Sequence, residues 1–286
     1  MPTPDSFHVV LLSGSRYSEL ASRVVQRLAA VEGIQFSAMV RGVNLSRLAA
    51  VGPRAILRRT INLARSSLRR PRNSNDSEGE RSGAPALSSY PGLAIHQVKS
   101  IGGKESADML AELAPDVCLN TGGCGILREP FLREAGLGVL NAHSGLPVTR
   151  GFNAYEWQLY YGIPLTLSAH MIAEGVDTGD VVISQALKLI DNPSLSRIRE
   201  GYLEETVTVL ADAVLRVREE REACLTPQAI SAGRQHFAMH ETLRRHLDAA
   251  LSDSGPEACI SSYPYEGAAS SITTERLAAL RNDRFV

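Results

Sequence analysis

Residues 7–15 read Phe-His-Val-Val-Leu-Leu-Ser-Gly-Ser, a short apolar run closed by a turn of small residues. Apolar residues at helical spacing follow over 18–31, and a second apolar run occupies 34–40. Strand, turn, helix and strand in this order predict the opening of a βαβ unit with a parallel sheet. The rhythm continues, with strands expected at 93–98, 116–120 and 138–140 and a helix at 104–113.

The second half of the chain keeps the same alternation. We expect a helix at 151–161, strands at 165–172 and 181–189, and a long amphipathic helix at 195–217. The sequence therefore predicts an α/β fold with a mostly parallel twisted sheet and flanking helices. Residues 1–222 form the predicted main domain, and residues 223–286 form a small C-terminal extension.

Composition excludes several classes of protein. The chain has 286 residues, 44% of them hydrophobic, and a formal net charge of -1, which gives no overall attraction to nucleic acid or an anionic membrane. The N-terminus lacks a basic segment followed by an apolar run, and no stretch reaches the roughly 18 apolar residues of a membrane span. We expect a cytoplasmic protein with a small-molecule partner, neither nucleic acid nor membrane, and a homodimer is one option.

Cysteine usage favours a reducing compartment. The cysteines have no CxxC pair and no dense framework, which argues against structural zinc and disulfides. They are Cys118, Cys124, Cys224 and Cys259.

Two segments between the predicted strands differ from the rest. Residues 54–72 are rich in arginine with apolar residues interleaved, which predicts a basic amphipathic helix, although a solvated helix face explains the same pattern. Residues 71–89 carry turn formers and charge with almost nothing to bury, which predicts a mobile loop.

Polar residues suited to acyl transfer follow the strand at 138–140. Asn141 and His143 come directly after it, and ligands bind at the carboxyl ends of strands in open α/β sheets. Alternate residues of an extended segment project to one side, so an amide and an imidazole would face the same space. Asp177, in a turn-forming stretch, adds a carboxylate. Taken singly, each has an ordinary alternative: a turn asparagine, a core histidine and a hairpin aspartate.

Together these residues carry a resemblance. Asn141-Ala142-His143 is followed by Leu146-Pro147, Arg150-Gly151, Trp157 and Gly175-Val176-Asp177-Thr178-Gly179-Asp180-Val181. This series resembles the catalytic block of formyltransferases that use 10-formyltetrahydrofolate, a group that includes glycinamide ribonucleotide transformylase, methionyl-tRNA formyltransferase and sugar-amine N-formyltransferases. It implies a Rossmann-like formyltransferase domain over 1–222 with catalytic residues Asn141, His143 and Asp177. His170 corresponds to a supporting histidine.

The resemblance also implies binding residues. The loop 121–127 aligns with the family's pterin-binding loop, and the turn 13–15 with the position where glycinamide ribonucleotide transformylase binds a phosphate. A glycine-rich turn lets a backbone approach a flat ring or an anion, although it also serves as a plain connection. The predicted donor-binding residues are Gly123, Cys124, Ile126, Leu127, Val139 and Asp177. The predicted substrate-binding residues are Ser13, Gly14, Ser15 and Arg150.

These features predict an enzyme that moves a formyl group from 10-formyltetrahydrofolate to a primary amine of a small molecule, such as an amino sugar or a specialised metabolite. No metal is expected. A hydrolase that releases formate from the same donor is an alternative, because related enzymes use the same three residues on water. A non-catalytic module that binds a partner through 54–72 is another. The unusual cluster at 233–240 either lines the acceptor pocket or caps the sheet.

Overall fold

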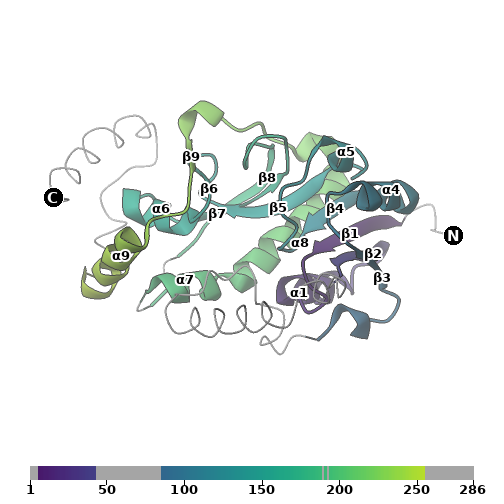
Figure 1. Ribbon diagram of the computed structural model, residues 1–286, viewed down its shortest axis with the longest axis horizontal. Coiled ribbons are helices and arrows are strands. Elements are labelled where there is room, and N and C mark those ends of the chain that lie inside the picture. Colours follow the sequence, from purple (N-terminus) through teal and green to yellow (C-terminus); the bar gives the residue numbers. More distant parts are fainter. Residues whose placement is uncertain (1–5, 43–84, 189, 192, 255–286) are drawn as a thin grey trace, which may run out of the picture. The chain divides into compact units, whose positions relative to one another are not determined.

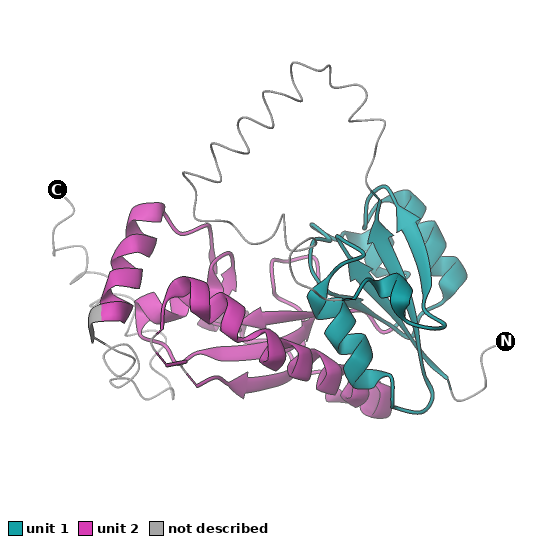
Figure 2. Cartoon of the chain, turned by 90° about the horizontal axis from the view of Figure 1, so that it is seen from below, with its two compact units in different colours: residues 1–136 teal, residues 137–286 magenta. Residues whose placement is uncertain are grey.

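The computed structural model describes residues 6–42, 85–188, 190–191 and 193–254 (Figure 1). The chain divides into two compact units, residues 1–136 (unit 1) and 137–286 (unit 2), coloured teal and magenta in Figure 2. We describe each unit by itself.

Unit 1 is an alternation of strands and helices. Its elements are β1 (Phe7–Ser13), α1 (Glu19–Leu28), β2 (Ile34–Arg41), η1 (Leu87–Ser89), β3 (Ala94–Val98), α4 (Lys104–Leu113), β4 (Val117–Asn120) and α5 (Glu129–Leu132). The strands pair in the order β3-β2-β1-β4, and every pair is parallel. The predicted βαβ opening and parallel sheet are therefore confirmed.

Local signals explain where the elements of unit 1 begin and end. Ser18 caps α1 by accepting a hydrogen bond from the Ala21 N–H at 3.2 Å, which satisfies one of the free donors of the first turn. Helix α4 ends at Ala114 in the left-handed conformation, before Pro115, whose ring disfavours helical backbone in the preceding residue. Leu11 and Leu12 of β1 are fully buried, as expected for a central parallel strand.

Unit 2 mixes antiparallel strands with longer helices. Its elements are β5 (Val139–Ser144), β6 (Thr149–Gly151), α6 (Ala154–Tyr161), β7 (Thr166–Met171), β8 (Val181–Ala186), α7 (Leu195–Gly201), α8 (Leu203–Glu220), η2 (Arg221–Cys224), η3 (Ile230–Ala232), β9 (Arg234–His236) and α9 (Glu241–Ser254). Strands β5, β7 and β8 pair antiparallel in that order, and α8 packs on all three.

Two elements of unit 2 differ from the sequence prediction. Strand β5 continues to Ser144 because its polar half pairs with β7, so Asn141 and His143 lie within a paired strand and not after its end. The helix expected over 195–217 is two helices, α7 and α8, which meet at Tyr202. Tyr202 is buried, and its hydroxyl donates to the Lys188 carbonyl at 2.8 Å, so tertiary contacts set the break.

The described part of the predicted C-terminal extension belongs to the packing of unit 2. Strand β9 pairs in parallel with β6, and α9 packs against α6. The buried carboxylate of Glu156 on α6 pairs with Arg199 of α7 and lies 3.8 Å from the Nε of Arg244 on α9. A buried charge is retained when it is paired, so this network ties three helices together. The predicted domain boundary at 222 stays a prediction.

Several predictions concern segments outside the described elements of the two units. The basic segment 54–72 and residues 71–84 of the predicted loop lie outside the described residues, as do residues 255–286. Leu87, within the described end of that loop, is fully buried, and its N–H donates to the Arg16 carbonyl. Over the ranges that the structure describes, no helix is long and apolar enough to cross a membrane, and no group of three or more His, Cys, Asp or Glu residues is arranged to hold a metal.

Candidate active site

Strands β5 and β7 of unit 2 carry the polar side chains of the site. Asn141 on β5 stands opposite His170 on β7, and His143 stands opposite Ser168. Successive side chains of a strand alternate between faces, so Asn141 and His143 share one face with His170. The antiparallel pairing therefore explains why two separated segments bring an amide and two imidazoles together.

The third predicted residue reaches the same place from the turn between β7 and β8. Asp177 has φ 51°, in the left-handed region that aspartate tolerates better than most residues. Gly179 lies so close to β7 that a Cβ there would meet the Met171 carbonyl oxygen at 1.9 Å. Gln228 donates through Nε2 to the backbone carbonyls of Asp177 and Gly179. The turn is thus held from both sides, and the carboxylate is directed at β5.

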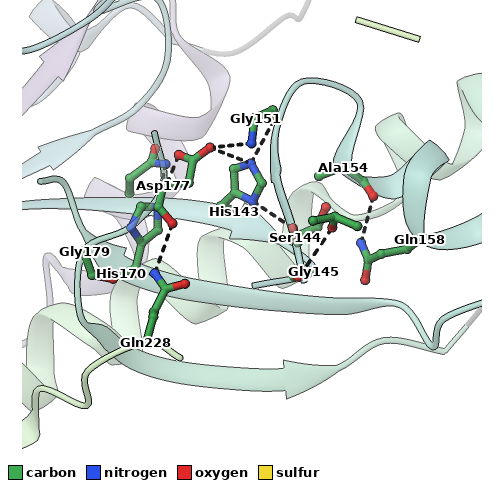
Figure 3. Close-up of polar contacts among 12 residues, drawn as sticks. His143, Ser144, Gly145, Gly151, Ala154, Gln158, His170, Asp177, Gly179 and Gln228 are labelled. Carbon is green, nitrogen blue, oxygen red and sulfur yellow. Dashed lines mark hydrogen bonds and ion pairs between the residues drawn. The ribbon is translucent and has the colours of Figure 1, made fainter. Parts of the chain in front are cut away.

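The three predicted catalytic residues form one connected group, and Figure 3 shows the part of it around His143, His170 and Asp177. The Asp177 carboxylate lies 3.1 Å from His143 Nε2 through Oδ2 and 3.8 Å from His170 Nε2 through Oδ1. Asn141 Nδ2 lies 3.1 Å from His170 Nε2. The Gly151 N–H donates to Asp177 Oδ2 at 2.8 Å. Asn141, His143 and Asp177 therefore meet as the sequence analysis expected, with His170 between the amide and the carboxylate.

Every partner of the His143 ring is a hydrogen-bond acceptor. Nδ1 lies 2.7 Å from the Ser144 carbonyl, and Nε2 lies 3.0 Å from the Gly151 carbonyl as well as near Asp177. These partners favour the charged imidazolium, in which both ring nitrogens donate. Burial alone lowers the pKa of His143, but the hydrogen bond and charge of Asp177 and the two carbonyls outweigh it and raise the pKa above its ordinary value.

His170 has the opposite surroundings. Its Nδ1 donates to the Met171 carbonyl at 2.9 Å, while its Nε2 faces the Asn141 amide nitrogen, a donor. With the Asp177 carboxylate farther away, at 3.8 Å, this contact favours a neutral ring that accepts through Nε2 and carries its proton on Nδ1. Burial and the nearby charge of His143 lower the pKa of His170 to about 4, against the smaller opposing effect of Asp177. The side chain is 1% exposed, which explains the large effect of desolvation.

Asp177 is held as a carboxylate. Burial raises its pKa, but the hydrogen bond and charge of His143 and the Gly151 N–H outweigh burial and leave the pKa below its ordinary value. The site therefore combines an amide, a cation and an anion. His143 and Asp177 keep 12% and 18% of their side chains exposed, so both remain reachable from outside. Such a set can stabilise an oxyanion and accept a proton.

The predicted donor-binding loop lies in unit 1. Ile126 is 79% exposed, and a Cβ at Gly125 would meet nothing within 4 Å, which suits an apolar contact with a flat ring. Leu127 and Cys124 are buried, and the Cys124 thiol donates to the Leu12 carbonyl. Burial raises the pKa of Cys124 to about 12, which makes its thiol a poor nucleophile.

Gly123 lets the predicted donor-binding loop pack closely against Gly14. A Cβ at Gly14 would meet the Gly123 Cα at 2.9 Å, so the absence of side chains lets the loop pack on the turn 13–15. The N–H groups of that turn are engaged within unit 1: Gly14 donates to the Gly122 carbonyl and Ser15 to Ser13 Oγ. This engagement weakens the prediction that the turn binds an anion.

Two other predicted contacts are buried in unit 2. Val139 is fully buried in β5. Arg150 is 7% exposed and donates to the carbonyls of Ile230 and Gly233, which favours a structural role.

Sequence reasoning missed Gly151 and Gln228 as contacts of Asp177. Gly151 stood in the motif, but nothing in the sequence indicated that its N–H binds the carboxylate and its carbonyl the imidazole. Gln228 lies in a polar connection 51 residues beyond Asp177, and it has no motif of its own. Both contacts arise from tertiary folding.

Comparison with known families agrees with this geometry. Residues 72–214, half of the chain, match the family model described as formyl transferase. The chain belongs to the formyl transferase family. The predicted family and α/β fold class are thus confirmed, and the matched segment includes Asn141, His143 and Asp177.

Individual relatives cover parts of the chain. It is 32% identical over 126 residues to the trifunctional purine biosynthetic protein adenosine-3 of Bos taurus, over 41% of this chain and 12% of that protein. It is 30% identical over 167 residues to the methionyl-tRNA formyltransferase of Anaeromyxobacter dehalogenans, over 55% of this chain and 54% of that protein. The chain thus spans only about half, or less, of the length of these relatives.

A solved structure shows the same fold. The crystal structure of glycinamide ribonucleotide transformylase 1 from Symbiobacterium toebii matches with a TM-score of 0.52 at 15% identity, covering 77% of this chain and 91% of that one.

Proposed function

We propose that this formyl transferase family member moves a formyl group from 10-formyltetrahydrofolate to the primary amine of a small molecule. The observation that carries the proposal is the contact of the Asp177 carboxylate with the ring of His143, one side chain along the same strand face from Asn141. Family membership supports the reaction class, and the near-neutral charge of the chain favours a small acceptor over a nucleic acid.

The donor supplies a formyl group that is already activated for transfer. The lone pair of the acceptor amine forms the new C–N bond, and the electron pair of the formyl C=O bond moves onto oxygen. A preorganised donor aimed at such an oxyanion is worth about 3 kcal/mol. The Asn141 amide and the His143 cation supply that positive potential, and the fixed partners of His143 keep it charged before the reaction begins.

Asp177 accepts the proton that the attacking amine must lose. Its pKa is kept low, so it is available as a base at neutral pH, and the proton passes directly or through one water. The oxyanion then returns its electron pair to re-form the C=O bond, and the C–N bond to the donor breaks. The electron pair of that bond stays on the departing nitrogen, which takes up the proton that Asp177 accepted from the amine. The products are the N-formyl amine and tetrahydrofolate.

The test uses the purified full chain with 10-formyltetrahydrofolate and a panel of primary amines, with tetrahydrofolate and the formylated amine measured separately. The proposal predicts equal amounts of both products and their joint loss in an Asp177→Asn variant. Tetrahydrofolate released without any formylated amine would instead identify a hydrolase. Neither product with the wild-type chain, together with no binding of the donor at millimolar concentration, would contradict the proposed activity.

A further inference from the structure

The exposed large apolar side chains of unit 2 lie in segments that adjoin the catalytic group. In the described part of this unit they number four: Phe152 (63% exposed), Val176 (43%), Ile230 (47%) and Phe237 (75%). Single exposed apolar residues are ordinary on a protein surface, but a group of them beside a polar site indicates binding. Backbone contacts link the segments that carry them to the residues that hold Asp177.

Each of the four is linked through the chain or a backbone contact to a residue of the site or to that residue's neighbour. Val176 precedes Asp177, and Phe152 follows Gly151, whose N–H binds Asp177 and whose carbonyl binds His143. The Ile230 carbonyl accepts from Arg150, the residue before Gly151.

Phe237 reaches the site through strand pairing. It follows His236, which pairs with Gly151 in the β6–β9 register, and the Phe152 N–H donates to the His236 carbonyl at 3.0 Å. The two phenylalanines therefore follow paired positions of strands that lie about 4.8 Å apart. A Cβ at Gly151 would meet the His236 carbonyl oxygen at 2.3 Å, so β9 is pressed against the residue that binds both His143 and Asp177.

We propose that Phe152, Ile230 and Phe237 form an apolar rim that receives an aromatic or alkyl part of the acceptor amine. The inference rests on the proposed function and narrows its substrate class to amines with an apolar group. The guanidinium of Arg150 already donates hydrogen bonds to two carbonyls. We therefore do not expect it to bind an anionic group of the acceptor amine. Val176 is left out of the rim because it adjoins Asp177 itself, where donor and acceptor meet.

A tryptophan beside the rim allows ligand binding to be followed by fluorescence. Trp157 is the single tryptophan of the sequence, and its indole N–H donates to the Phe237 carbonyl at 3.1 Å. A ligand seated on Phe237 is expected to change the fluorescence of Trp157, which measures binding without turnover.

The experiment titrates the full chain with 2-phenylethylamine, ethanolamine and O-phosphoethanolamine. The phosphate probe tests Arg234, an exposed cation on β9. Burying a phenyl group is worth roughly 1.5–3 kcal/mol, so 2-phenylethylamine should bind at least about tenfold more tightly than ethanolamine. Phe237→Ser and Phe152→Ser should remove most of that preference, whereas Phe237→Leu should keep it. Tyr17→Ser, at an exposed aromatic of unit 1, is the control and should change nothing.

Equal or absent binding of the three amines, or preference for the phosphate probe, would overturn the rim. It would also be overturned by serine variants that raise KM for the donor and not for the amine. A fourth contrary result is that the serine variants dissociate a dimer while amine binding stays the same. The proposed activity is judged separately. Formylation of all amines without preference would contradict the rim alone, and tight binding of 2-phenylethylamine without any formyl transfer would contradict the activity alone.

Discussion

The surroundings of His143 and His170 show how two histidines beside one carboxylate are held in different states. Their ring centres lie 6.2 Å apart, and both face Asp177. His143 meets only acceptors, which favours its charged form, whereas His170 also has the donor of the Asn141 amide at Nε2, which favours its neutral form. Neighbours, and not residue type, thus assign the cation of the site to the more exposed ring. Environments that push two pKa values apart often separate the roles of catalytic groups.

The largest expected effect comes from removing the carboxylate that both histidines share. Asp177→Asn should lower kcat for formyl transfer by about 1000-fold, because proton transfer by a positioned group typically contributes 100-fold to 10,000-fold. The pKa of His143 should fall toward that of His170, since its main stabilising charge is gone. Steady-state rates and NMR titration of the histidines measure both effects.

Glu174→Gln is the matched control, because Glu174 is an exposed carboxylate of the same turn. It should leave both measurements unchanged. An Asp177→Asn variant that keeps wild-type activity would remove Asp177 from the mechanism.

A second change acts on the amide that distinguishes the two rings. Asn141→Ala should lower kcat by about 100-fold or more, as expected for the loss of one oxyanion donor. It also removes the donor that faces His170 Nε2, so the pKa of His170 should rise. Full activity together with an unchanged His170 titration would contradict both assignments.

The free energy of unfolding should fall at acid pH because His170 is held neutral in the folded chain. Its pKa is about 4 in the folded chain against 6.5 when unperturbed, so its contribution is present above pH 6.5 and is lost as the pH falls toward 4. That difference corresponds to about 3 kcal/mol for this buried ring. Urea unfolding between pH 7 and pH 4 should show the loss, and His170→Gln should flatten it. A variant with the same acid slope as the wild type would mean that His170 does not cause it.

His143 should act in the opposite direction. Its raised pKa makes its contribution to stability complete below pH 6.5 and removes it as the pH rises through the folded-state pKa. The wild type should therefore lose stability on the alkaline side of neutrality, and His143→Gln should abolish that slope. The same urea measurements, continued to pH 9, test this. An alkaline slope that persists in His143→Gln would have to come from another group.

The smallest expected effect comes from a backbone position that contacts His143 and not His170. Gly151→Ala places a Cβ 2.3 Å from the His236 carbonyl oxygen at φ +93°, which should destabilise the fold by about 1–3 kcal/mol and lower the pKa of His143 while leaving His170 unchanged. Gly92→Ala is the control, because Gly92 has φ +79° with nothing within 4 Å and isolates the cost of the backbone angle. Equal effects of the two substitutions would show that the contact with β9 is unimportant.

The sequence predicted the fold well where periodicity carried the information. Helix α4 was predicted with its observed bounds, and β1, β2 and β3 to within a residue, because buried strands and amphipathic helices leave clear patterns. The break at Tyr202 was missed because the apolar pattern runs on across it, while the hydroxyl contact of Tyr202 with Lys188 has no signal in the local sequence. Strand β5 was ended too early because its second half is polar, as functional strands often are.

The sequence indicated the side chains of the candidate site but not the backbone groups that contact them. Asn141, His143 and Asp177 could be named from their order along the chain. The protonation states could not, since they depend on the carbonyls of Ser144 and Gly151, which carry no sequence signal. The cluster at 233–240 was noticed, but its meaning depends on the pairing of β9 with β6.

The most direct test is nitrogen-15 NMR of the histidine rings at pH 7, with the chain labelled in its seven histidines and the two signals assigned through His143→Gln and His170→Gln. We expect both ring nitrogens of His143 to be protonated and His170 to carry a single proton on Nδ1. A neutral His143, or a doubly protonated His170, would contradict the arrangement of charge on which the proposed mechanism depends.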